Sequence, residues 1–199
     1  MTQGKKLILV AGRPGSGKTT AAKTVSSTLS NSYYFSIGSE LRAIGLEGRP
    51  SALSSEITQY GYELRNHLPL PAHLAHHVLE ECILRSSAEL IIIDGYPQYQ
   101  DRLPEFKATL ARVAADVLAI CEISVTDDIA RLRLQSREDR IKDIEEDTEF
   151  INKRLAGYQQ NALPTIEQLA RRYPLRKIDG SLSKQEVAQN LMLTIKKYL

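Results

Sequence analysis

The 199-residue sequence has no tryptophan, only 6% aromatic residues and two cysteines, too few for a disulfide-rich scaffold. Cys82 in LEECIL and Cys121 in LAICEI both lie in apolar runs, which predicts two buried free thiols. No stretch approaches the roughly 18 apolar residues of a membrane span. The apolar run in MTQGKKLILVAG is too short for a signal peptide. We therefore expect a cytoplasmic protein.

An excess of one charge is also missing, because 26 Lys and Arg stand against 24 Asp and Glu, for a net charge of +2. This balance gives no broad basic field, so binding to nucleic acid is not expected. The 42% hydrophobic and 25% charged residues are ordinary for a globular protein. We expect residues 1–199 to form a single domain with a proper core, to be monomeric and to have no membrane partner.

Short apolar runs alternate along the chain with longer segments of helical spacing. The apolar runs predict strands at residues 6–11, 33–37, 89–94, 116–123 and 174–179. The helical spacing predicts helices at 17–30, 38–45, 51–66, 71–86, 100–113, 126–137, 146–171 and 183–197. The runs ELIIID and DVLAICEI are apolar on both faces, which is typical of buried parallel strands. This order predicts an α/β fold, with helices on both faces of a central parallel sheet.

A glycine-rich loop, GRPGSGKT at residues 12–19, matches the P-loop pattern G-x-x-x-x-G-K-[ST] in full. Its backbone N–H groups and the following helix N-terminus would hold a phosphate. Lys18 would reach the β- and γ-phosphates, and the Thr19 hydroxyl would bind Mg²⁺. The alternative is a turn that merely joins a strand to a helix. The predicted nucleotide-binding residues here are Gly12, Gly15, Ser16, Gly17, Lys18, Thr19 and Thr20.

A carboxylate, Asp94, ends the buried strand in IIIDGYP and is the second predicted group for Mg²⁺; the alternative is that it caps the next turn. Many P-loop ATPases follow this aspartate with a glutamate that activates water, whereas Gly95 follows here. The guanine-reading N-K-x-D sequence is also missing, since NKRL at 152–155 lacks the aspartate. The pattern favours transfer to a bound acceptor over hydrolysis.

An arginine near the second predicted strand, Arg42 in SIGSELR, suits bidentate capture of a phosphate monoester, although it could be a solvated surface charge. The segments GRPGSGKTT, SIGSELR, DGYP, KRLAGY and LRKIDGS occur in the order found in nucleoside monophosphate kinases. On these motifs the chain resembles adenylate kinases and the related UMP/CMP kinases over nearly its full length.

The resemblance implies a three-layer α/β/α P-loop kinase fold with a central parallel five-stranded sheet. It implies two appendages, an acceptor arm (the NMP-binding helical arm) at about 38–71 and a short lid at about 134–146. Leu70 backbone groups would meet the acceptor base, and Arg154 would bridge the two nucleotides' phosphates. Gly180 to Leu182 would lie near the ATP base; the alternative is a simple turn at the end of a strand. The implied acceptor-site residues are Ser36, Gly38, Arg42, Leu70, Gly95, Gln98, Arg102 and Arg154.

Three further arginines, Arg133, Arg137 and Arg140, are spaced four and three apart and would share one face of a continuing helix. Like charges on one face repel unless an anion lies among them, and phosphoryl transfer develops such an anion. With Lys18 and Arg154 they form the predicted catalytic set, and Arg133 and Arg137 would also bind ATP. A solvated charged helix is the alternative. No Cys or His cluster lies between 133 and 154, so no zinc is expected.

The departures from the family pattern gather around the acceptor. Adenylate kinases usually have an arginine followed by a glutamine four residues later, whereas this chain has Gln98 and then Arg102. Ile37 and Ser39 stand where Thr and Asp are usual. Our hypothesis is that Arg102 reaches the acceptor phosphate or meets the base edge, shifting preference away from AMP; an exposed arginine without a role is the alternative.

Four histidines in NHLPLPAHLAHHVL suggest a metal site, but a third ligand is not evident, so surface or helix-contact histidines are expected. The sequence thus predicts Mg²⁺- and ATP-dependent phosphoryl transfer to a nucleoside monophosphate, with AMP as the leading acceptor. The alternatives are a UMP/CMP kinase, a P-loop kinase for another small molecule, and a non-catalytic nucleotide-binding regulator.

Overall fold

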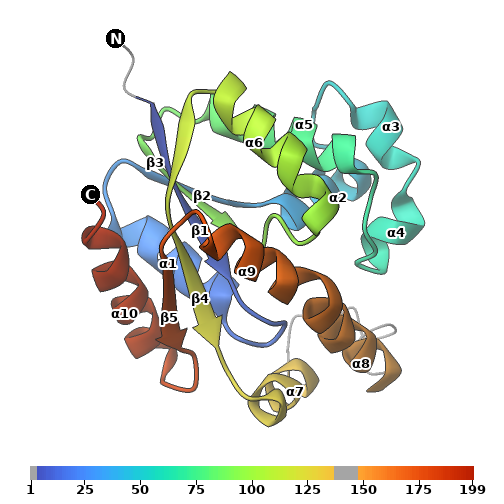
Figure 1. The fold of residues 1–199 in the computed structure, drawn as a ribbon. Coiled ribbons are helices and arrows are strands. Elements are labelled where there is room, and N and C mark those ends of the chain that lie inside the picture. The colour runs from blue at the N-terminus through green and yellow to red at the C-terminus, as the bar shows by residue number, and fades with distance from the viewer. Residues whose placement is uncertain (1–3, 137–147) are drawn as a thin grey trace.

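The computed structural model describes residues 4–136 and 148–199 (Figure 1). A five-stranded sheet lies at its centre, and every neighbouring pair of strands is parallel, as predicted. The spatial order is β2 (Ser32–Ser36), β3 (Leu90–Asp94), β1 (Lys5–Ala11), β4 (Ala115–Ser124) and β5 (Leu175–Asp179). The carboxyl ends of all five strands therefore lie along one edge of the sheet.

Two hydrophobic cores lie on opposite faces of the sheet, because alternate residues of each strand point to opposite sides. On β1, Leu7 and Leu9 belong to one core, while Ile8 and Val10 belong to the other. All four are at most 2% exposed, which explains why the strands read as continuous apolar runs. Two helices, α1 (Lys18–Thr28) and α10 (Lys184–Lys196), cover the Ile8 face (Figure 1).

The opposite face is covered by α2 (Ile37–Glu47), α5 (Ala72–Arg85), α6 (Leu103–Arg112) and α9 (Leu163–Ala170). The three-layer α/β/α prediction is therefore confirmed. A network of polar contacts holds α2 against α5: the Glu40 carboxylate accepts hydrogen bonds from Arg49, from Arg85 at 2.5 Å and from the Cys82 thiol at 3.3 Å. Cys82 and Cys121 are buried free thiols, as predicted.

The predicted helix at 51–66 is wrong as a single element, because two short helices, α3 (Ser54–Thr58) and α4 (Gly61–Arg65), replace it. Both pack on α2 at one place: a Cβ on Gly45 would lie 3.2 Å from Ile57 and 2.4 Å from Leu64. In a continuous helix those two side chains would be about 10 Å apart along the axis. The break at Gln59 and Tyr60 lets both reach the same spot.

The predicted helix at 146–171 also differs in detail. It comprises α8 (Thr148–Gly157), a π-helical turn (Tyr158–Ala162) and α9 without interruption. Leu163 N–H donates to Tyr158 O, five residues earlier, which inserts one extra residue into the turn. A further helix, α7 (Asp127–Gln135), follows β4, and the Thr126 side chain caps it by accepting from Ile129 N–H.

Candidate functional site

The glycine-rich loop joins β1 to α1 at the carboxyl edge of the sheet, between a strand and a helix as predicted. Gly12 has φ +145°, and a Cβ there would lie 2.4 Å from the Ile123 carbonyl oxygen. Gly15 has φ +81°, and its Cβ would lie 2.5 Å from the Ala130 carbonyl oxygen. Both positions need glycine because the loop is pressed against β4 and α7. The backbone is thereby curled in front of α1, as the predicted phosphate-binding loop requires.

Beside this loop, the Asp94 carboxylate accepts hydrogen bonds from two hydroxyl groups. β3 lies next to β1, in register with Val10 opposite Asp94, so the carboxylate reaches the start of α1. Its Oδ2 accepts from Thr19 Oγ1 at 2.5 Å and from the Tyr34 hydroxyl at 3.0 Å. The structure thus brings the two predicted metal-site residues into contact. Tyr34 was missed by the sequence analysis, since only the adjacency of β2 and β3 brings it there.

This corner fits a hard divalent cation. Asp94 is 3% exposed, and its Oδ1 is buried without a hydrogen-bond partner in the described part of the chain. The Ser16 hydroxyl in the loop is also buried and has no hydrogen-bond partner among the described residues. Carboxylate and hydroxyl oxygens are the ligands that Mg²⁺ takes, directly or through water. Burial, and next the negative charge of Asp94, raise the pKa of Tyr34, so its hydroxyl remains a donor.

Arg133 lies over the same loop from α7. Its Nη1 donates to the Gly180 carbonyl at 2.8 Å and more weakly to the Ser16 carbonyl at 3.4 Å. Gly180 follows β5, so one guanidinium connects the glycine loop, α7 and the turn after β5. Arg133 thus lies against the loop that the sequence predicts to bind ATP. Arg137 and Arg140, the other two members of the stripe, lie outside the described residues.

Lys18, Gly95 and Gln98 come together at the far side of the loop. A Cβ on Gly95 would lie 3.5 Å from Lys18 Cε and 3.3 Å from Gln98 Nε2. Gln98 Nε2 donates to the Gly95 carbonyl at 2.6 Å. The φ of Gly95, +68°, lies in a backbone region that side-chain-bearing residues rarely adopt, so this turn favours glycine. Gly95 thus lies beside both Gln98 and the predicted phosphate-binding lysine.

Arg42 projects from the first turns of α2. Its Nη2 donates to the Ser39 hydroxyl at 3.3 Å, and its Nη1 lies 3.2 Å from His67 Nδ1 and 3.4 Å from where a Gly38 Cβ would stand. His67 was not predicted as a site residue; it has a positive φ of +53° and lies near the end of the predicted acceptor arm.

A chain of side chains connects Arg42 to Arg154. The centres of the His67 ring and of the Phe150 ring in α8 are 6.1 Å apart. The Arg154 guanidinium lies over the Phe150 ring, 5.7 Å from the ring centre. The two arginines predicted to hold phosphate therefore occupy one region, although they are distant in the sequence.

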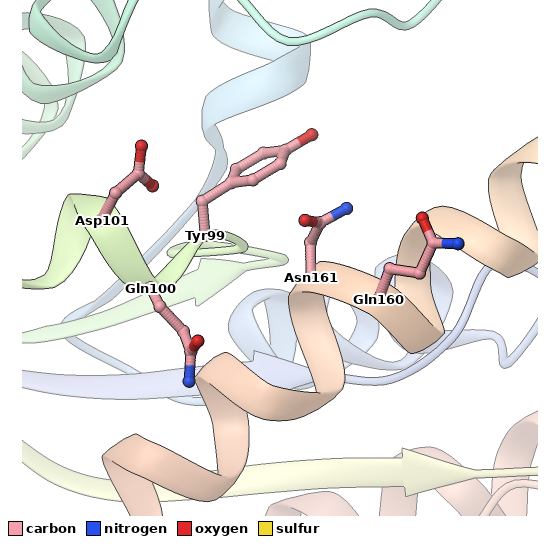
Figure 2. A pocket seen from close by; sticks show the side chains of 5 residues that line it. All are labelled: Tyr99, Gln100, Asp101, Gln160 and Asn161. Atoms are coloured by element: carbon pink, nitrogen blue, oxygen red, sulfur yellow. The ribbon is translucent and has the colours of Figure 1, made fainter.

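Arg102 and Leu70 also come together. Arg102 Nη2 donates to the Leu70 carbonyl at 2.7 Å, and its guanidinium lies 4.6 Å from the centre of the Tyr99 ring. Arg102 is half-buried rather than exposed. Figure 2 shows the neighbouring cavity of about 270 Å³, lined by Tyr99, Gln100 and Asp101 on one side and by Gln160 and Asn161 on the other.

A second cavity of about 230 Å³ lies between the glycine loop and β4, and the sequence analysis did not find it. Its buried carboxylate, Glu122, accepts from the Tyr158 hydroxyl at 3.0 Å and has Lys177 at 4.0 Å. Arg13 of the loop lies 5.7 Å from the Tyr158 ring centre and forms an ion pair with Asp127 of α7. Burial, and next the charge of Glu122, raise the pKa of Tyr158.

The histidines of α5 have protein partners rather than a shared ligand. His73 lies 2.7 Å from Glu56, His77 lies 3.1 Å from Glu81, and buried His76 is hydrogen-bonded to Tyr96 at 2.9 Å. In residues 4–136 and 148–199, no three His, Cys, Asp or Glu side chains are grouped to hold a metal ion. Over the same residues, no helix has the length and apolar character to cross a membrane.

Known proteins resemble this chain over most of its length. A family model described as an AAA domain matches residues 11–149, which include the glycine loop and Asp94. The adenylate kinase of Nitratiruptor sp. is 29% identical over 94% of this chain and 93% of its own. That of Nautilia profundicola is 25% identical over 96% and 97%, and that of Campylobacter jejuni subsp. doylei is 30% identical over 97% of each.

Proposed function

This chain belongs to the adenylate kinase family, and from that premise we propose that it transfers the terminal phosphoryl group of ATP to AMP. The single observation that supports this best is the presence of two separate groups of basic side chains, each suited to bind phosphate. One set is the glycine loop with Lys18, and the other is the region that holds Arg42 and Arg154. An enzyme that only hydrolysed ATP would not need the second set.

On the ATP side, the curled loop holds the phosphates with backbone N–H groups, and Lys18 neutralises the β- and γ-oxygens. Thr19 and Asp94 would hold Mg²⁺, which, when bound, neutralises charge on the transferring phosphoryl group. Gly95 follows Asp94 and carries no side chain that could activate a water molecule. Arg133 reaches the glycine loop from α7 and would bind the ATP phosphates there. We assign the same phosphate-binding role to Arg137 and Arg140.

On the acceptor side, Arg42 would bind the phosphate of the monophosphate, and Arg154 would bridge both nucleotides. Gly38, Ser36, Gly95 and Gln98 would line the pocket. An oxygen of the acceptor phosphate attacks the γ-phosphorus while the bond from that phosphorus to the β–γ bridging oxygen breaks. The bridging oxygen leaves on ADP, and the acceptor becomes a second nucleoside diphosphate. Catalysis rests on positioning and on neutralising charge.

A second candidate acceptor, CMP or UMP, is favoured by the position of Arg102. Its guanidinium donates to the Leu70 carbonyl, which we expect near the base. A guanidinium offers only donors, whereas the edge of adenine that forms base pairs offers one donor and one acceptor. The carbonyl-bearing edges of pyrimidines match such a group better.

The test is a coupled assay of ADP release with ATP, Mg²⁺ and AMP, CMP, UMP, GMP or dTMP in turn. Turnover with AMP above all others supports the proposal, and turnover with CMP or UMP above AMP supports the second candidate. Tight ATP binding with no turnover on any monophosphate would instead indicate a regulator, or a kinase for another small molecule. Lys18→Ala should weaken ATP binding, while Arg42→Ala should weaken binding of the monophosphate.

We also infer a cytoplasmic monomer, on the basis of the family and the balanced charge. Light scattering of the purified protein, with and without nucleotide, should give the mass of one 22.3 kDa chain. A stable mass of twice that value would contradict the inference.

A further inference from the structure

We propose that Tyr34 is a positioning residue for the metal–nucleotide site: its hydroxyl fixes the rotation of the Asp94 carboxylate, so that Oδ1 faces the bound metal. This inference rests on the proposed function, because it concerns the site of Thr19 and Asp94. It goes further by giving a role to a residue on β2, outside both the glycine loop and the DGYP segment.

The hydrogen bonds around Asp94 are unequally divided between its two oxygens. Oδ2 accepts from Thr19 at 2.5 Å and from Tyr34 at 3.0 Å, whereas Oδ1 is buried without a partner in the described part of the chain. The side-chain torsion that rotates a carboxylate has a broad energy minimum, so a carboxylate is not held by its own stereochemistry. Two donors on one oxygen therefore determine where the other oxygen points.

Thr19 alone is a poor anchor for this rotation. Its hydroxyl oxygen is itself the expected Mg²⁺ ligand and belongs to the loop that grips the nucleotide. Tyr34 has no such second task. It stands on β2 opposite Ile92, two residues before the Ser36–Asp94 pair, so its side chain lies diagonally beside Asp94 on the same sheet face.

The Tyr34 ring is held from several sides. It packs against the core formed by β1, α1 and α10. Lys23 Nζ of α1 lies 5.8 Å from the ring centre. A ring held this way delivers its hydroxyl at a fixed position, which is what orients a metal ligand from outside the first coordination sphere.

The neighbouring residue offers a matched control. Tyr33 lies on the same strand, but its hydroxyl accepts from Arg85 at 3.1 and 2.6 Å, away from Asp94. Tyr34→Phe and Tyr33→Phe each remove one hydroxyl from β2 and keep the ring. Only Tyr34→Phe changes the hydrogen bonds of Asp94.

The experiment is calorimetric titration of ADP into the wild type and both variants, once with excess Mg²⁺ and once with EDTA. We expect equal ADP affinity in EDTA for all three proteins. The gain in affinity from Mg²⁺ should be about tenfold smaller in Tyr34→Phe, the size typical when an outer partner of a metal ligand is lost. The Mg²⁺ concentration for half-maximal activity should rise in parallel. Tyr33→Phe should match the wild type in both.

An undiminished Mg²⁺ gain in Tyr34→Phe, with a normal gain in the wild type, would overturn this inference alone. A loss of ADP affinity that is equal with Mg²⁺ and with EDTA would also overturn it, since Tyr34 would then only support the loop. Absence of any Mg²⁺ gain in the wild type would overturn the proposed metal site, and this inference with it.

Discussion

Replacing Arg102 by glutamine should change which base the enzyme prefers. Arg102 now donates to the Leu70 carbonyl at 2.7 Å and lies over the Tyr99 ring at 4.6 Å. Its guanidinium presents five donors and no acceptor. A glutamine amide presents one donor and one acceptor side by side, which is the arrangement that pairs with adenine in other recognition sites. Arg102→Gln should therefore favour AMP.

The expected change in base preference follows from the energy of a bidentate contact to a base, and the expected change in stability follows from the loss of the Leu70 and Tyr99 contacts. A good bidentate contact to a base gives about 1–3 kcal/mol of discrimination. Because Arg102 is half-buried and glutamine is shorter, we take the lower part of this range. The ratio of kcat/KM for AMP to that for CMP should then rise about tenfold, which is about 1.4 kcal/mol. The variant should also lose about 2 kcal/mol of folding stability through the lost Leu70 and Tyr99 contacts, lowering Tm by about 4–8 °C.

The assay is steady-state kinetics with AMP, CMP, UMP, GMP and dTMP for the wild type and Arg102→Gln. Arg112→Gln serves as the control, because Arg112 ends α6, the helix that begins next to Arg102, and its described contacts are with Glu80, Glu105 and Thr109 rather than with Leu70 or Tyr99. An unchanged ranking of the five acceptors, accompanied by the expected fall in Tm, would refute a role at the base edge. A uniform loss of kcat/KM would instead place Arg102 at the acceptor phosphate.

Three further outcomes are expected. Arg42→Ala should raise KM for the monophosphate about 10- to 100-fold and leave KM for ATP unchanged in steady-state kinetics, since a charged hydrogen bond is worth about 1.5–3 kcal/mol. Burial acts to raise the pKa of Glu40, but hydrogen bonds from two arginines and a thiol outweigh it and hold the pKa below 4.5. The stabilising effect of the Glu40 carboxylate is thus complete above pH 4.5 and is lost as the pH falls below that value. In urea titrations Glu40→Gln should therefore have a smaller free energy of unfolding than the wild type at neutral pH, and this difference should shrink in acid. Tyr158→Phe should lower the free energy of unfolding by about 1–3 kcal/mol in the same titrations, because it leaves the Glu122 carboxylate buried without its donor.

The parts of the site that the sequence predicts are those built from one continuous segment. The glycine loop, the strand before it and the helix after it need only local spacing, and Asp94 is marked by its place at the end of an apolar run. Contacts such as Tyr34 with Asp94, or Arg102 with Leu70, depend on strand order and on the docking of the acceptor arm. Such contacts join residues that are 60 and 32 positions apart, and no local pattern encodes them.

The helices show the same division. The amphipathic spacing at 51–66 is real, yet packing of both Ile57 and Leu64 against Gly45 breaks the helix in two. Tertiary contact here overrides local propensity. The core itself was easier to predict, because strands buried on both faces leave an unmistakable run of branched apolar residues.

The π-helical turn has a consequence for reading related sequences. One additional residue between α8 and α9 rotates everything that follows by roughly a quarter turn relative to a regular helix. Tyr158 can then reach Glu122 while Asn161 borders the opposite cavity. A relative that lacks this extra residue would need a one-residue gap at this place, and an alignment without the gap would pair surface positions of α9 with buried ones. Deleting a single residue between Tyr158 and Ala162 is therefore expected to be more harmful than a conservative substitution at any one of them.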